Sequence, residues 1–231
     1  IFDMEYTGTP LILAIKNKNI EIIKLLLACP EIDANSKLLA KNIDNFRCSK
    51  KPALYIAAEE NNIMLINLLL SNPNIDVNAE YEFFNKKENR YEVETALIIA
   101  LKNNNTEIID ILLSNPNIQN PQPNKNYIGE TPLNFAIKNY KYDIVKKILS
   151  KPNIDVNSKT RYTFGLKDTP LRIALKSNDI EMIKLLLKHP KININSRSKF
   201  TNNLKQIEKE SILISSVRSN NNEISKLLLK H

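Results

Sequence analysis

The sequence predicts an all-α solenoid of about six helix-turn-helix repeats, joined by long β-hairpin or loop fingers. Two observations lead to this fold class. A Thr-Pro-Leu-x-x-Ala segment and its variants recur at 9–14, 52–57, 95–100, 131–136, 169–174 and 211–216. Each copy is followed by apolar residues at helical spacing in two successive stretches. One copy can bury its apolar face only against its neighbours, so the copies predict a stacked array.

The start of each first helix follows from capping chemistry. Thr131 can accept a hydrogen bond from a free backbone N–H of the first turn, and Pro132 then takes the first helical position. Leu133, Ala136 and Ile137 fall on one helical face, which we expect to be buried. A small residue at the centre of that face lets neighbouring helices approach closely. The central residues are Ala14, Ala57, Ala100, Ala136, Ala174 and Ser216.

The turn between the two helices of a copy is also predictable. We expect one residue in the left-handed conformation, which Asn tolerates, and a following residue that caps the second helix. The second helix carries an acidic residue in its first turn in most copies and stops before a proline. The residue pairs at the turn are Lys18-Asn19, Asn61-Asn62, Asn104-Asn105, Tyr140-Lys141, Asn178-Asp179 and Asn220-Asn221.

These motifs resemble the ankyrin repeat, whose signature is T-P-L-H-x-A and whose period is about 33 residues. Ile-Asp-Val-Asn at 75–78 and 154–157 also resembles the segment that closes an ankyrin repeat. The resemblance covers essentially the whole chain, and it implies one continuous array over 1–231. Ile1 is not a start methionine, so we expect a piece of a longer protein. The expected repeats are approximately 7–35, 50–78, 93–120, 129–157, 167–195 and 209–231.

The connectors between copies are longer than the family period requires. The resemblance implies projecting fingers here, the longest over 36–51, 79–94 and 196–210. Exposed aromatic and Arg side chains are typical anchors of protein interfaces. Alternatively, the rings pack between the fingers and hold the long hairpins together. The candidate finger residues are Phe46, Arg47, Phe83, Phe84, Tyr91, Tyr127, Arg161, Tyr162, Phe164, Arg197 and Phe200.

The resemblance implies that a partner binds the concave face, formed by first-helix ends and fingertips. The residues two positions after the central residue, which we name the ladder residues, are Lys16, Glu59, Lys102, Lys138, Lys176 and Arg218. The residues just before the Thr-Pro-Leu segment, which we name the pre-helix residues, are Gly8, Lys51, Glu94, Glu130, Asp168 and Glu210. Both a basic groove and simple matching of charges to the helix dipole explain this pattern.

The sequence lacks the residue patterns on which enzymes depend. Its histidines, His189 and His231, fall at the ends of second helices without a plausible partner cysteine. Three glycines cannot build a phosphate-binding loop, and no Cys-x-x-Cys spacing occurs. We therefore expect no catalysis, no cofactor and no metal.

The expected function is that of a scaffold or adaptor that binds a protein partner of acidic character. A nucleic acid or another anionic surface is the second hypothesis, because the pI is near 9.3 and basic residues stand beside aromatic ones. It ranks lower because the connector over 79–94 is acidic and no nucleic-acid motif occurs. A third hypothesis is a structural spacer within a longer ankyrin protein.

Two cysteines do not form a disulfide framework in a chain of this size, which favours a reducing compartment, the cytoplasm or the nucleus. The apolar runs are too short to insert into a membrane. We expect a monomer. The sixth copy is more polar than the others, with Ser216, Asn222 and Ser225, and is expected to cap the array with a polar outer face.

Overall fold

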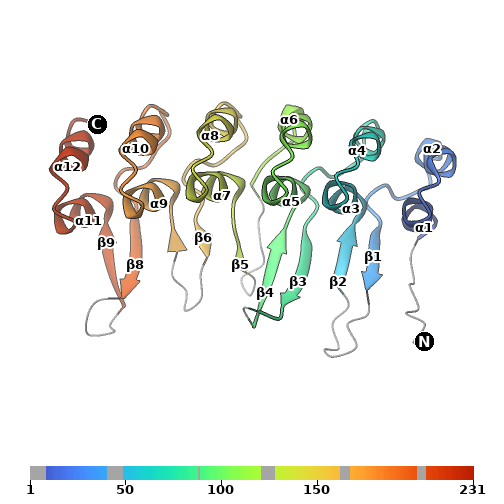
Figure 1. The fold of residues 1–231 in the computed structure, drawn as a ribbon, viewed down its shortest axis with the longest axis horizontal. Helices are drawn as coiled ribbons and strands as arrows, with labels where there is room; N and C mark the ends of the chain where they lie inside the picture. Colours follow the sequence, from blue (N-terminus) through green and yellow to red (C-terminus); the bar gives the residue numbers. More distant parts are fainter. Residues whose placement is uncertain (1–8, 41–48, 88, 121–127, 162–166, 202–206) are drawn as a thin grey trace. The chain divides into compact units, whose positions relative to one another are not determined.

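The computed structural model describes residues 9–40, 49–87, 89–120, 128–161, 167–201 and 207–231 (Figure 1). It divides into two compact units, Ile1–Gly129 and Glu130–His231, which are described one at a time. Both units are mostly helical, with pairs of short helices joined by tight turns and with short β-strands between the pairs. No helix in these ranges is long and apolar enough to cross a membrane.

The first unit contains three helix pairs and a small set of strands. β1 pairs antiparallel with β2 and β3 with β4, and β5 adds to β4 in parallel. The element bounds are α1 (Pro10–Lys16), α2 (Ile20–Ala28), β1 (Lys37–Ala40), β2 (Ser49–Pro52), α3 (Ala53–Glu59), α4 (Ile63–Leu70), β3 (Tyr81–Asn85), β4 (Arg90–Glu94), α5 (Ala96–Lys102), α6 (Thr106–Ser114) and β5 (Ile128–Gly129).

The second unit repeats the same plan with two antiparallel hairpins, β6–β7 and β8–β9. The first helices of its copies lie side by side, and each packs on the second helix of its own copy. The element bounds are α7 (Pro132–Lys138), α8 (Tyr142–Leu149), β6 (Thr160–Arg161), β7 (Lys167–Asp168), α9 (Pro170–Lys176), α10 (Ile180–Leu187), β8 (Arg197–Thr201), β9 (Ile207–Ser211), α11 (Ile212–Arg218) and α12 (Asn222–Leu229).

The predicted caps and turns are confirmed. Thr131 Oγ1 accepts a hydrogen bond from the Asn134 backbone N–H at 3.1 Å, and the other Thr and Ser caps of first helices do the same. The residue after each first helix and its C-cap has a φ between 53° and 57°. The next residue caps the second helix through its side chain, except at Lys141. The left-handed residues are Lys18, Asn61, Asn104, Tyr140, Asn178 and Asn220.

The central small residues are buried in both units, as predicted. Ala57, Ala100, Ala136 and Ala174 have no exposed surface, and neither does Ser216. Apolar residues of the second helices, such as Ile66 and Ile183, close the core from the other side. The interior therefore runs between the row of first helices and the row of second helices within each unit.

Asn residues at the ends of the extended segments form hydrogen bonds with the next copy. Asn78 Nδ2 donates to the Asn117 carbonyl at 2.8 Å, while its Oδ1 accepts from the Gln119 N–H at 2.9 Å. Asn35 and Asn157 each form the same two hydrogen bonds with the backbone of the copy that follows their own. Both polar atoms of one side chain are thus satisfied, which explains Asn at this position of the motif.

The polar outer face expected of the sixth copy is wrong. Ser216 is buried and its hydroxyl donates to the Leu213 carbonyl, so it adds nothing polar to the surface. Exposed apolar side chains occupy this end instead, namely Leu213, Ile214, Val217 and Leu229. The equivalents of Ile214 in three preceding copies are Tyr55, Asn134 and Arg172, whose side chains form hydrogen bonds with residues further along the chain.

Candidate partner-binding surface

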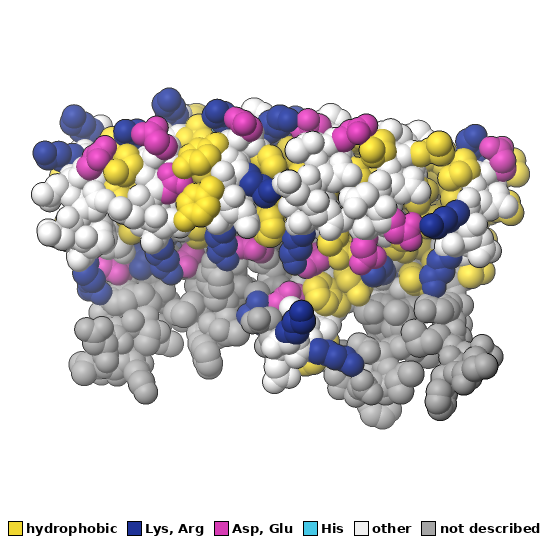
Figure 2. Space-filling model, in the orientation of Figure 1, with side chains coloured by type: hydrophobic (Ala, Val, Ile, Leu, Met, Phe, Trp, Pro, Cys, Tyr) yellow, Lys and Arg dark blue, Asp and Glu magenta, His cyan; other side chains and the backbone are white. Residues whose placement is uncertain are grey.

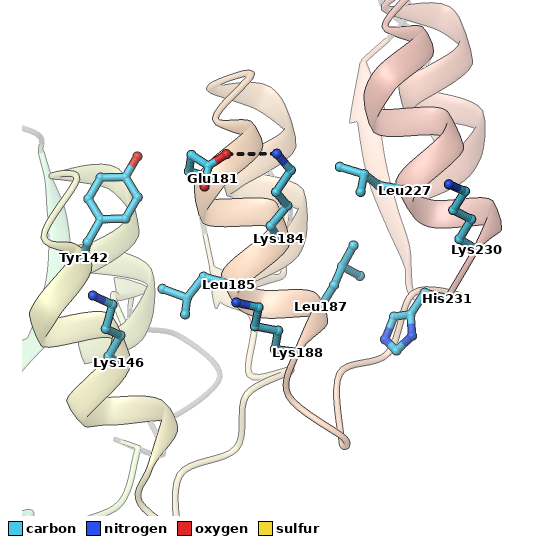
Figure 3. Close-up of a pocket in the computed structure, with 10 residues that line it drawn as sticks. All are labelled: Tyr142, Lys146, Glu181, Lys184, Leu185, Leu187, Lys188, Leu227, Lys230 and His231. Carbon is cyan, nitrogen blue, oxygen red and sulfur yellow. Dashed lines mark hydrogen bonds and ion pairs between the residues drawn. The ribbon is translucent and has the colours of Figure 1, made fainter.

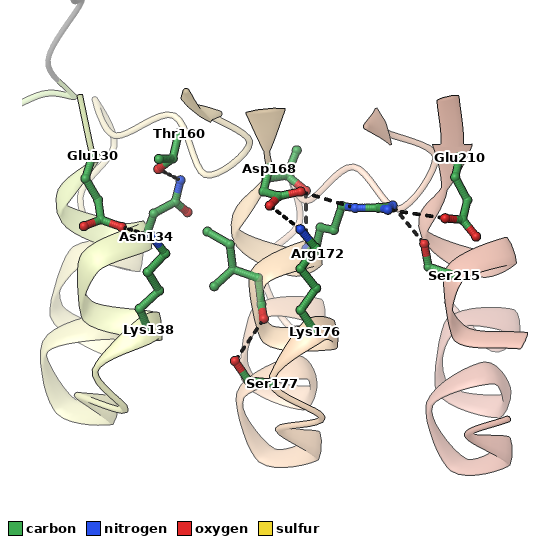
Figure 4. Close-up of polar contacts among 12 residues, drawn as sticks. Glu130, Asn134, Lys138, Thr160, Asp168, Arg172, Lys176, Ser177, Glu210 and Ser215 are labelled. Carbon is green, nitrogen blue, oxygen red and sulfur yellow. Dashed lines mark hydrogen bonds and ion pairs between the residues drawn. The ribbon is translucent and has the colours of Figure 1, made fainter. Parts of the chain in front are cut away.

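The ladder residues and the pre-helix residues form ion pairs with one another within a copy. Lys176 Nζ lies 2.6 Å from Asp168 Oδ2, and Lys138 Nζ lies 2.6 Å from Glu130 Oε1 (Figure 4). Lys102 pairs with Glu94 in the same way, and Arg218 Nε lies 3.5 Å from Glu210 Oε1. Each long basic side chain reaches back along its helix to the carboxylate that precedes the helix.

The second copy has the same ion pair with the charges exchanged. Lys51 is the pre-helix residue, and its Nζ lies 2.7 Å from Oε2 of Glu59, the acidic ladder residue. In the first copy the pre-helix residue is Gly8, which carries no carboxylate and lies outside the described residues. Burial, and then the charge of Lys51, lower the pKa of the Lys16 amine. In the second copy the pre-helix residue and the ladder residue have both changed sign, which the helix dipole alone does not explain.

In three of these pairs the carboxylate is buried while the cation extends into solvent, whereas Glu130 is partly exposed and Glu59 is more exposed than Lys51. The side chain of Asp168 is 6% exposed and that of Lys176 is 56% exposed; Glu210 and Arg218 show 5% and 58%. Glu94 and Lys102 show 7% and 40%. A molecule that approaches these ends of the first helices therefore meets positive charge. Figure 2 shows basic and acidic side chains along the margin where the helices meet the hairpins.

Three buried polar side chains, each two positions before the central alanine, reach from one copy into the next. Tyr55 Oη donates to Glu94 Oε2 at 2.7 Å, and burial together with this carboxylate raises the pKa of Tyr55. Arg172 Nη1 donates to Ser215 Oγ at 2.8 Å, and Nη2 donates to Glu210 Oε2 at 3.4 Å (Figure 4). Asn134 Nδ2 donates to Thr160 Oγ1 at 2.7 Å.

A groove lies over two of the ladder residues in the second unit. It has a volume of about 760 Å³, and we name it the front groove. Arg172, Lys176, Glu210 and Arg218 line it, together with the turn at 220–222. Because the two acidic partners are buried beneath Lys176 and Arg218, the front groove is basic and suits an anionic ligand.

The rings of the β3–β4 hairpin form two clusters. Tyr81 stacks on Phe83 with ring centroids 5.0 Å apart, and its other neighbour is Tyr55 at 4.7 Å. Phe84 faces Tyr91 edge to face at 5.1 Å, across the hairpin register. All of the hairpin rings keep part of their surface exposed. They hold the hairpin together and still present apolar surface.

The structure describes only some of the other predicted finger residues. Arg197 begins β8 and is exposed. Arg161 ends β6 and Phe200 lies in β8, but their side chains are outside the described part. The remaining predicted finger residues also lie outside the described residues, namely Phe46, Arg47, Tyr127, Tyr162 and Phe164.

Two features missed by the sequence analysis determine this surface. One is the ion pairing between the ladder residues and the pre-helix residues, which the exchange of charges at Lys51 and Glu59 indicates. The other is the inter-copy role of Tyr55, Asn134 and Arg172, for which the sequence gives no clear sign. Among the described residues, no three His, Cys, Asp or Glu side chains come together as metal ligands.

Comparisons with known proteins agree with the fold. The family model for ankyrin repeats in three copies matches residues 3–81 and 82–160, and the model for a single ankyrin repeat matches 166–196. No curated protein matches the sequence significantly. The crystal structure of EF0377, an ankyrin repeat protein, aligns over 100% of both chains with a TM-score of 0.57 and 18% identity. At that identity the likeness shows the fold alone.

Proposed function

The chain belongs to the ankyrin repeat family, whose repeats generally mediate contacts between proteins, and on that premise we propose that it is a protein-binding scaffold. Its partner offers an acidic segment to the ends of the first helices. The exposed cations over buried carboxylates support this proposal above all, because they give the front groove a positive surface with a fixed position.

The ion pairs do not prevent the ladder cations from binding a partner. The cations of the Lys176–Asp168 and Arg218–Glu210 pairs are 56% and 58% exposed, so each keeps N–H donors with which it can bind a second carboxylate without leaving the buried one. The buried acid also holds the cation in place, which lowers the entropy lost on binding. In the first unit, Lys16 and Lys102 belong to a proposed surface of that unit, and the acidic Glu59 interrupts it.

We propose that the hairpins contribute a second part of the interface. Phe83, Phe84 and Tyr91 supply half-buried rings in the first unit, and Arg197 supplies an exposed guanidinium in the second. Rings that are already packed lose little freedom on binding, which suits them as anchors. Cys29 is an exposed free thiol, and we propose that the chain works as a monomer in a reducing compartment.

Neutralising the front groove tests the proposal. The variant Lys176→Gln/Arg218→Gln is expected to lower the affinity for a fluorescein-labelled decaglutamate peptide about tenfold, since two exposed ionic contacts of up to about 1 kcal/mol each are lost. Fluorescence anisotropy measures the affinity. Lys24→Gln serves as the matched control, because Lys24 is an exposed ion-paired lysine of the first unit, outside the ladder.

The same titration separates the protein-binding hypothesis from the nucleic-acid one. A single-stranded oligonucleotide of ten nucleotides is compared with the peptide over a range of salt concentrations. Tighter binding of the oligonucleotide with a steep logarithmic salt slope would assign phosphate contacts to this surface and overturn the proposal. If the double variant and the control variant bind decaglutamate with equal affinity, the front groove is not its binding site.

A further inference from the structure

A second groove lies on the second helices of unit Glu130–His231 and shares no residue with the front groove. It has a volume of about 750 Å³ and lies over α8, α10 and α12 (Figure 3). Its side chains include Lys146 of α8, Lys188 just after α10, Leu227 of α12 and Lys230 just after α12. We name it the outer groove.

The outer groove combines an apolar floor with a basic rim. Leu185, Leu187 and Leu227 are partly exposed and form its apolar part. Figure 3 shows Leu187 and Leu227 between α10 and α12, and Leu185 directed towards α8. The rim holds four lysines and a single acidic residue, Glu181. The rim lysines are Lys146, Lys184, Lys188 and Lys230.

The rim lysines are available to a ligand. Lys146 pairs with Asp143 at 3.2 Å, one helical turn away. Lys184 pairs with Glu181 at 2.9 Å on its own helix and also lies 3.7 Å from Glu223 of α12, so it is the most engaged of the four. Such pairs are weak and readily exchange partners. Within the described ranges, Lys188 and Lys230 form no ion pair. The groove therefore has cations that its own acidic residues do not neutralise.

The fold does not require this basic rim. In the first unit, α4 contains no charged residue, and the charged residues of α6 are Glu107 and Asp110. The positions that correspond to Lys188 and Lys230 carry Ser71 after α4 and Ser114 at the end of α6. A lysine near the helix C-terminus is favoured by the dipole, yet these equivalent helices form without one.

We propose that the outer groove binds an acidic amphipathic helix of a partner protein. Its leucine floor takes the apolar stripe of that helix, and its lysines meet carboxylates on both sides of the stripe. Neighbouring helices pack about 10 Å apart, so α8 to α12 spans roughly 20 Å, which is the length of about 13 helical residues. A peptide of that size can therefore contact all three helices.

The composition of the outer groove favours a helix over a nucleic acid. Single-stranded nucleic acids bind where aromatic rings and arginines stack on the bases. The rings that line this groove are those of Tyr142 and the terminal His231. The Tyr142 hydroxyl already donates a hydrogen bond to the Asp179 carboxylate at 2.7 Å. The other large side chains are leucines and lysines. Leucine matches an apolar stripe and offers no stacking surface.

The probe for this site is a fluorescein-labelled peptide of about 14 residues with leucines along one helical face and glutamates elsewhere. Binding is measured by anisotropy on the whole chain. Lys188→Gln/Lys230→Gln is expected to weaken binding about tenfold, because two exposed charge contacts are lost. Both lysines are exposed and lie outside the core, and thermal melting confirms that the double variant is folded.

A second peptide tests the apolar floor without altering the protein. Replacing its leucines by serines keeps every carboxylate, and this peptide is expected to bind at least tenfold more weakly than the leucine peptide. The front-groove variant Lys176→Gln/Arg218→Gln is expected to bind the leucine peptide as the unaltered chain does. That control separates the outer groove from the proposed function, which can fail or succeed independently.

Three results would overturn the inference. The first is an unchanged affinity of Lys188→Gln/Lys230→Gln for the leucine peptide. The second is equal binding of the serine and leucine peptides, which would leave only non-specific charge attraction. The third is binding to phosphatidylserine vesicles without binding to the leucine peptide, which would assign the surface to a lipid headgroup layer.

Discussion

At the scale of single residues, the tight turn between paired helices is the most demanding position of each copy. Six turns place a residue other than glycine in the left-handed region. The short polar side chain of Asn can form a local hydrogen bond that makes the left-handed conformation less costly. Lys18 and Tyr140 adopt the same conformation without that compensation. The sequence therefore accepts backbone strain at two turns that a glycine would relieve.

Tyr140→Gly is expected to raise the free energy of unfolding by about 1 kcal/mol, because glycine adopts the left-handed conformation without a Cβ clash. Tyr140 is an exposed residue, so its ring contributes little packing to be lost. Urea denaturation followed by circular dichroism measures the change. Asn220→Gly at the equivalent turn is expected to change stability by less, because Asn already tolerates the left-handed conformation. Equal stabilisation by Tyr140→Ala would attribute the effect to the side chain instead.

At the scale of elements, the β3–β4 hairpin divides into a base and a tip. At the base, Tyr81 and Phe83 continue the packing of Tyr55 on α3, with Lys51 Nζ 5.1 Å from the Tyr81 ring. At the tip, Phe84 and Tyr91 contact each other across the register. The base is joined to the helical core, and the rings of the tip stabilise the hairpin itself.

Replacing residues 84–91 by an Asn-Gly turn is expected to leave the thermal midpoint nearly unchanged, since the two ring contacts of the base remain and Asn-Gly suits a two-residue hairpin. Tyr81→Ala is the matched comparison, and it is expected to destabilise by about 1–3 kcal/mol through lost ring packing. Calorimetry of the two variants checks the expectation. Unfolding of the shortened hairpin variant at room temperature would show that the tip is part of the core.

At the scale of the whole molecule, stability comes from contacts between neighbouring copies rather than from one central core. Tyr55 connects two copies in the first unit, and Arg172 connects two copies in the second. These two residues share no described partner. In a repeat array, contributions of this kind depend only on nearest neighbours.

Tyr55→Phe and Arg172→Met are therefore expected to act additively. Removing Tyr55 Oη leaves the buried Glu94 without one donor and is expected to cost about 1–2 kcal/mol. Removing the buried Arg172 is expected to cost about 3 kcal/mol, because Asp168 and Glu210 each lose a cation. The double variant should equal the sum within about 0.5 kcal/mol in urea denaturation. A larger coupling would show that the units do not respond independently.

How much could be predicted from the sequence depends on how far apart along the chain the interacting residues lie. Caps, turns and central alanines depend on a few adjacent residues, so the motif predicts them. The pairing of Lys176 with Asp168 joins two residues on either side of the helix start, so neither residue indicates it by itself. The contact of Arg172 with Glu210 and the lysine rim of the outer groove depend on how copies pack, which no single motif contains.

For the proposed partner, the exchanged pair Lys51–Glu59 makes the second copy differ in surface charge from the copies on either side of it. An extended chain that crosses α1, α3 and α5 in turn meets a cation at Lys16, an anion at Glu59 and a cation at Lys102. An uninterrupted row of glutamates suits that order poorly. A chain with a lysine or arginine between two acidic residues suits it well, and the place of that basic residue fixes which copy each part of the chain contacts.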